Sequence, residues 1–173
     1  PLNVDWDGTT VGFNTPKINL VNANIVINQT NAAGTANLFA CNELTIDNST
    51  IIAENLGGQF AAADKVVIKN GSNVNAGSNG QVIGVTSKLE VTDSSLTAYR
   101  QNGTGIAQAV VATSTGEIVF TNSTVDIQFV NPSNAVYDYQ KSNAVLISGA
   151  GKFTVNSGDV NLKANSGNNT AAL

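Results

Sequence analysis

A short pattern of residues recurs six times along this chain and constrains its fold more than any other feature. Each copy begins with a charged residue, followed by two apolar residues two positions apart, a turn rich in Asn and Ser, and a second apolar segment. The copies begin at Lys17, Glu43, Lys65, Lys88, Glu117 and Lys152. A repeat of this size with strand periodicity and no helical stretch is typical of a solenoid, in which each turn buries its apolar face against its neighbours.

Two columns of the aligned repeats are apolar throughout. The first column holds Ile18, Leu44, Val66, Leu89, Ile118 and Phe153, and the second holds Leu20, Ile46, Ile68, Val91, Phe120 and Val155. Side chains of a strand alternate between its two faces, so residues two apart point the same way. We therefore predict that both columns lie in the core.

The other apolar segments predict three short strands in each coil. One follows the turn, and another, such as residues 38–40, leads back to the next charged residue. The predicted fold is an all-β single-stranded β-helix, or β-solenoid, of about six coils. In the third copy Asn73 and Asn75 occupy positions that are mostly apolar elsewhere, which predicts a one-residue bulge that turns Val74 inward.

The domain organisation follows from where the repeat starts and stops. Residues 1–14 lack the repeat and contain Trp6, which predicts an N-terminal cap over the open end of the stack. Residues 15–164 are predicted to form the solenoid. Residues 165–173 are rich in Asn, Gly and Ala, and we expect a tail or a linker to a further domain of a longer chain.

Two polar columns are predicted to stabilise the stack. The column in the turn after the first strand consists of Asn22, Asn48, Asn70, Asp93, Asn122 and Ser157. Asn tolerates the left-handed backbone of a sharp corner, and stacked amides hydrogen-bond between coils, so we predict an asparagine ladder. The charged residues that begin successive copies mostly alternate in sign, which predicts ion pairs between adjacent coils.

Composition excludes several classes of protein. The chain has 173 residues, a net charge of −4 and no histidine. Without histidine there is no Ser-His or Cys-His nucleophile and no zinc site of clustered Cys and His. The acidic balance argues against a nucleic acid partner, and no apolar run is long enough to span a bilayer.

The single cysteine, Cys41, has no partner for a disulfide within the chain. Counting back two positions from each charged residue gives its counterparts as Ala63, Thr86, Thr115 and Ala150. All are small, so we predict a packed or half-buried side chain rather than a reactive thiol.

Unequal repeat lengths indicate where a ligand would bind. The fourth and fifth copies are the longest, because residues 99–107 and 129–143 form extra loops. Loops often carry function, and aromatic rings beside hydrogen-bonding groups suit a sugar ring or a peptide. The predicted ligand-binding residues are Tyr99, Arg100, Phe129, Tyr137, Asp138, Tyr139 and Lys141. The alternative is that these aromatic residues only pack onto the side of the solenoid.

The repeat columns, the Asn-rich turns and the Thr/Ser/Asn surface resemble the pectate-lyase-like β-solenoid domains of Gram-positive cell-surface adhesins, those of lactobacilli among them. The resemblance covers residues 15–164. It implies an extracellular domain of a cell-wall-anchored protein that holds a host or microbial glycan or glycoprotein. Pectate lyases use clustered Asp residues for calcium and a basic residue to abstract a proton. Arg100 has no acidic cluster at matching positions, so the lyase activity does not carry over.

We therefore expect a non-catalytic adhesin module, monomeric and without a cofactor or metal. Two alternatives stay open. A polysaccharide-degrading enzyme would bring two carboxylates, or a carboxylate and Arg100, together in a groove. A structural stalk would only set how far the rest of the protein extends, and adhesion would survive trimming of both loops.

Overall fold

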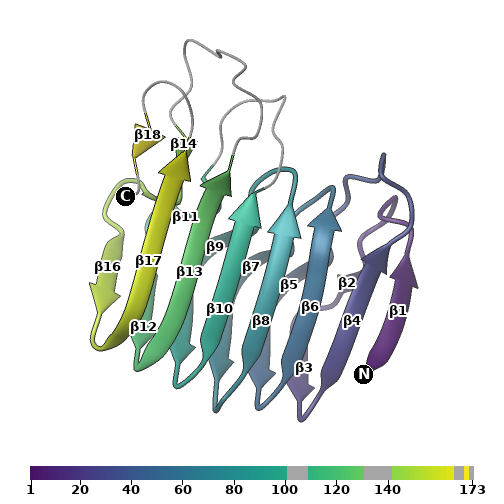
Figure 1. The fold of residues 1–173 in the computed structure, drawn as a ribbon, viewed down its shortest axis with the longest axis horizontal. Coiled ribbons are helices and arrows are strands. Elements are labelled where there is room, and N and C mark those ends of the chain that lie inside the picture. Colours follow the sequence, from purple (N-terminus) through teal and green to yellow (C-terminus); the bar gives the residue numbers. More distant parts are fainter. Residues whose placement is uncertain (101–108, 131–141, 166–169, 172–173) are drawn as a thin grey trace.

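The computed structural model describes residues 1–100, 109–130, 142–165 and 170–171. Over these ranges the chain forms strands and turns without any helix, and it winds into a parallel β-solenoid of about five turns (Figure 1). The predicted all-β solenoid is therefore confirmed.

Seven parallel strands form the first sheet, and they lie side by side in the order in which they occur along the chain. In spatial order they are β1 (Leu2–Trp6), β4 (Asn24–Gln29), β6 (Thr50–Leu56), β8 (Asn73–Ser78), β10 (Ser95–Arg100), β13 (Ser123–Val130) and β17 (Gly158–Asn165). Leu2 is in register with Ile25, and Val4 with Ile27, so the N-terminal segment adds a strand at this end of the stack.

The second sheet contains the remaining two strand segments of each coil. Its nine strands are β2 (Phe13–Asn14), β3 (Lys17–Val21), β5 (Phe39–Asp47), β7 (Ala61–Lys69), β9 (Ile83–Thr92), β11 (Val111–Thr113), β12 (Glu117–Thr121), β15 (Val145–Ile147) and β16 (Lys152–Val155). In β5, β7 and β9 the two predicted segments run together as one long strand, whereas in the later coils they are separate. A small third sheet pairs β14 (Ser142–Asn143) with β18 (Thr170–Ala171).

The long strands are irregular where their two segments join. The alternation of buried and exposed side chains breaks at Thr86 and Ser87, which are both exposed, and the register between β7 and β9 shifts at the same place. An extra residue bends a strand and increases its twist. The outer surface of the second sheet therefore changes direction along this line.

The core lies between the sheets and confirms the predicted columns except at Val155. Strand pairing aligns each column from the first copy to the last. Leu44, Val66, Leu89 and Ile118 are fully buried, whereas Val155 in the last coil is 42% exposed. Aromatic rings fill the N-terminal coils, where Phe39 stacks on Phe13 at 5.1 Å and meets Phe60 edge-on at 5.2 Å.

Val74 points inward as predicted, but the extra residue of this coil lies elsewhere. Val74 is in register with Ile51 and Leu96, so it needs no bulge of its own. The additional residue is Gly71 in the preceding turn, with a φ of 77° that glycine adopts without strain.

The Asn-rich turn has the predicted left-handed backbone. The positive φ values, between 46° and 57°, belong to Asn22, Asn48, Asn70, Asp93 and Asn122. Asn48 Nδ2 donates to Asn22 Oδ1 at 2.7 Å, and Asn122 Nδ2 donates to Asp93 Oδ1 at 2.6 Å. Asn70 leaves the column and donates to Asp47 Oδ1 at 2.7 Å. The predicted ladder is thus present in part.

A column of serines beside this turn forms a second ladder that the sequence analysis did not predict. Its members are Ser49, Ser72, Ser94 and Ser123. Each hydroxyl accepts a backbone N–H from the preceding coil, at distances from 2.9 to 3.3 Å. Each also donates to a carbonyl of its own turn, at 2.6 to 2.8 Å. The ladder therefore satisfies buried backbone donors that would otherwise lack partners at the corner.

The charged column forms ion pairs at its two ends. Lys17 pairs with Glu43 at 3.4 Å, and Lys152 pairs with Glu117 at 3.7 Å, as predicted for adjacent coils. In the middle Lys65 and Lys88 are neighbours of the same sign, and Lys88 pairs with Glu90 of its own strand at 2.9 Å. Exposed pairs of this kind contribute little to stability.

We expect acid to weaken the solenoid partly through Asp47. The hydrogen bond from Asn70 lowers the pKa of the Asp47 carboxyl below its ordinary 3.8; partial burial opposes this, and Lys69 at 3.3 Å lowers the pKa further. A depressed folded-state pKa stabilises the protein above the unfolded value, and this contribution is lost as pH falls through the folded value. The urea midpoint should therefore drop less for Asp47→Asn than for wild type between about pH 7 and about pH 3. An equal drop in both proteins would contradict this role.

Candidate functional site

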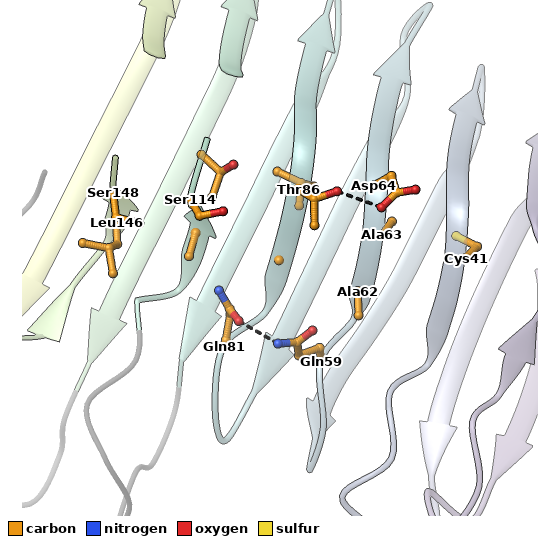
Figure 2. A pocket seen from close by; sticks show the side chains of 14 residues that line it. Cys41, Gln59, Ala62, Ala63, Asp64, Gln81, Thr86, Ser114, Leu146 and Ser148 are labelled. Atoms are coloured by element: carbon orange, nitrogen blue, oxygen red, sulfur yellow. Dashed lines mark hydrogen bonds between the residues drawn. The ribbon is translucent and has the colours of Figure 1, made fainter. Parts of the chain in front are cut away.

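A groove runs along the solenoid axis on the outer face of the second sheet, across β5, β7, β9, β11 and β15 (Figure 2). We call it the axial groove. Its volume is about 530 Å³, which is within the range of ligand-binding sites. Strands about 4.8 Å apart make its length roughly 19 Å over these five strands, so it is suited to an extended ligand.

The floor of the axial groove is a row of small side chains. Ala62, Gly84 and Ala112 are in register on successive strands, and the larger Leu146 ends the row on β15. The residues on either side of Ala62, Gly84 and Ala112 in their strands are buried. Small outward-pointing residues leave space above the backbone. Beyond them the sheet surface changes direction at the strand junction, and this raises one side of the groove. These two features together make the groove.

One side of the axial groove carries side-chain amides. Gln59 Nε2 donates to Gln81 Oε1 at 2.6 Å, and the Gln59 backbone N–H donates to Asn37 Oδ1 at 3.1 Å. A Cβ atom at Gly84 would lie 3.2 Å from Gln81 Oε1, so this amide leans over the floor. Each amide has two N–H donors and an acceptor oxygen, so the pair keeps hydrogen-bonding capacity for a ligand.

The opposite side carries hydroxyls and one carboxylate. Thr86 Oγ1 donates to Asp64 Oδ1 at 2.7 Å, and Ser87 Oγ donates to the Asp64 carbonyl at 2.7 Å. Two residues of the next coil therefore hold Asp64, and Ser114 and Ser148 continue this side. Figure 2 shows the Asp64–Thr86 pair farther along the strands than the Gln59–Gln81 pair, with the groove floor between them. Asp64 is the one charged side chain among the fourteen described residues of the lining.

Cys41 lies at one end of the axial groove, where a second hollow of about 260 Å³ adjoins it beside Asn14 and Pro16. The cysteine is half-buried, as predicted. Burial raises the pKa of the Cys41 thiol, and the charge of Asp64 raises it further, so the nucleophilic thiolate is disfavoured.

Of the four predicted repeat counterparts of Cys41, only Ala63 shares its column. The residues in register beyond Ala63 are Val85, Thr113 and Ile147. Counting a fixed number of residues back from the charged position fails, because the junction between the two segments lengthens in later coils.

Three of the predicted binding residues lie within the described ranges. Arg100 and Phe129 come together, with the guanidinium carbon 4.9 Å from the ring centroid, and both are only 3% exposed. Arg100 Nε donates to the Asn79 carbonyl at 3.2 Å, and burial lowers the pKa of its guanidinium. Tyr99 is half-buried and its ring lies over Gly77 of the neighbouring strand.

The other four predicted binding residues, Tyr137, Asp138, Tyr139 and Lys141, lie outside the described residues. Binding through the two loops therefore stays a prediction. The sequence analysis missed the axial groove. Its available signal was the row of small outward residues, with a glutamine at matching positions in two coils, Gln59 and Gln81.

Among the residues that the structure describes, no group of three or more His, Cys, Asp or Glu side chains is placed to bind a metal ion. The described lining of the axial groove offers one carboxylate, whereas glycoside hydrolysis generally uses two. None of the described segments is a helix that is long and apolar enough to cross a membrane.

Comparison with known proteins gives no match: no family model, no curated protein and no solved structure matches this chain. The resemblance to adhesin solenoids therefore rests on the residue pattern, and the function must be argued from the geometry of the site.

Proposed function

We propose that this chain is a non-catalytic glycan-binding module of an extracellular adhesin, and that it holds a carbohydrate chain along the axial groove. One observation carries the proposal. Hydrogen-bonding side chains line the two sides of a long, open groove whose floor is made mostly of small residues. The cell wall would hold the protein through another part of a longer chain.

The chemistry of the axial groove suits sugar hydroxyls, which both donate and accept hydrogen bonds. The amides of Gln59 and Gln81 and the hydroxyls of Thr86 and Ser114 also donate and accept hydrogen bonds, and the ionised carboxylate of Asp64 accepts them. The small residues Ala62, Gly84 and Ala112 let a sugar ring approach the sheet closely over β7, β9 and β11. Because the lining residues come from successive coils, the strands beneath the site repeat along the axis as the units of a glycan chain do.

Filling the groove is expected to abolish binding. In Ala112→Phe a large side chain would stand on the floor, where the strand readily accepts an aromatic residue. The matched control is Thr97→Phe, on the outer face of the first sheet. Binding to plant, bacterial and mucosal glycans is screened on an array, and affinities are then measured by calorimetry. We expect Ala112→Phe to bind at least about tenfold more weakly, a change of about 1.4 kcal/mol, while Thr97→Phe binds as wild type does.

The same assay separates the groove from the loops. If Ala112→Phe binds normally while the double variant Tyr137→Ala/Tyr139→Ala loses binding, the ligand is held by the loops and the groove proposal is wrong. If wild type binds no glycan at all, a structural stalk or a protein ligand becomes the better explanation.

A further inference from the structure

We infer that the axial groove selects uncharged carbohydrate chains over acidic ones, and that Asp64 sets this preference. The inference rests on the proposed function and specifies its ligand class. A chain of uronic acids carries a carboxylate on each ring, whereas a neutral chain presents hydroxyls at the same places. The two classes therefore differ most where the groove itself is charged.

The charge near the axial groove offers nothing to attract an acidic chain. Asp64 is the one charged residue of the described lining. On the five coils that the groove crosses, the neighbouring column beyond the strand junction contributes Glu43, Lys65, Lys88, Glu117 and Lys152. Glu90 pairs with Lys88 at 2.9 Å, so three acids and three bases cancel. A ligand carboxylate in the groove would meet the Asp64 carboxylate without a compensating excess of cations, and like charges a few ångströms apart repel even beside water.

The geometry of Asp64 also favours hydroxyl donors. Its side chain is exposed, and the Thr86 hydroxyl at 2.7 Å occupies only one of the acceptor sites of the carboxylate. Hydrogen bonds to an ionised acceptor are stronger than those to a neutral one. Asp64 thus strengthens the binding of a ligand that donates O–H hydrogen bonds and weakens the binding of a ligand that carries another anion.

The effect of Asp64 already extends across the groove strands. Its charge helps to raise the pKa of the Cys41 thiol on the adjacent strand β5, because a thiolate there would face a like charge. A carboxylate bound over the same strands would experience a repulsion of the same sign. The amides of Gln59 and Gln81 on the opposite side are neutral, so they do not offset this selectivity.

The test compares an acidic oligomer with its neutral ester and with unrelated neutral chains. The probes are an oligogalacturonate, the same oligomer with its carboxyls methyl-esterified, and neutral manno- and cello-oligosaccharides. Binding to the intact chain is measured by calorimetry at low salt for wild type, Asp64→Asn and the control Asp126→Asn. Asp126 accepts from Asn161 of the next coil at 3.0 Å, as Asp64 accepts from Thr86, but lies on the first sheet.

We expect wild type to bind the esterified oligomer or another neutral probe about 2- to 5-fold more tightly than the oligogalacturonate. Asp64→Asn should shrink this ratio by tightening binding of the acidic oligomer, and Asp126→Asn should leave it unchanged. Equal or tighter binding of the oligogalacturonate by wild type, with loss in Ala112→Phe, would overturn this inference while supporting the proposed function. Failure of wild type to bind any probe would overturn both.

Discussion

Replacing Phe60 with alanine is expected to lower the free energy of unfolding by about 3–5 kcal/mol. Phe60 is fully buried between the sheets and meets the edge of the Phe39 ring at 5.2 Å. A rigid stack cannot collapse into the space that the ring leaves, because strand pairing fixes the coils on either side. For a domain of this size the melting temperature should fall by roughly 6–20 °C.

The matched control for Phe60 is Phe13→Ala. Phe13 also touches Phe39, at 5.1 Å, but it lies at the N-terminal end of the stack and is 37% exposed. Its loss should cost well under half as much, because water already reaches the ring. Urea unfolding of both variants measures the difference. If the two changes cost the same, the centre of the solenoid would be no better packed than its end.

The two apolar columns show why this fold is predictable from sequence. Each coil must bury its apolar face against the next, so the same position is apolar in every copy, as at Leu44, Val66 and Leu89. The left-handed corner is equally local, because few residues other than Asn and Gly tolerate a positive φ. Both features depend on one short segment at a time; the repeat displays the apolar columns six times and the left-handed corner five times.

The register of the strand segment before each charged residue could not be predicted from the sequence repeat in the same way. Cys41, Val85 and Thr113 share one column, yet they stand at different distances from the charged residue that follows. The junction absorbs additional residues without disturbing the strands on either side. Since the axial groove lies along this junction, counting by repeat could not assemble its floor or its two sides.

The predicted loop site illustrates a different difficulty. Arg100 and Phe129 are long side chains near the only extra loops, which suggested an exposed patch. In a strand, however, one residue in two points inward, and both of these occupy inward positions next to each other. Sequence composition indicated which coils differ from the rest, but the strand alternation decides which side chains reach the surface.

The serine ladder leads to the second large expected effect: Ser72→Ala should cost about 1–3 kcal/mol. The Ser72 hydroxyl is 1% exposed, accepts the Ser49 backbone N–H at 3.1 Å and donates to the Lys69 carbonyl at 2.6 Å. Alanine would leave the Ser49 N–H buried without its acceptor, and a buried unsatisfied donor pays its full desolvation penalty.

The control for Ser72 is Ser95→Ala, which removes the same atom from a hydroxyl that donates to the Asn73 side chain, at 3.0 Å, on the exposed face of the first sheet. That change should stay within about 0.5 kcal/mol. Amide hydrogen exchange gives a second readout, because the Ser49 amide should lose protection in Ser72→Ala while amides of β12 keep theirs. If Ser72→Ala costs no more than Ser95→Ala and the Ser49 amide stays protected, the hydroxyl is not what holds the corners of adjacent coils together. The corner would then depend on the left-handed asparagines alone.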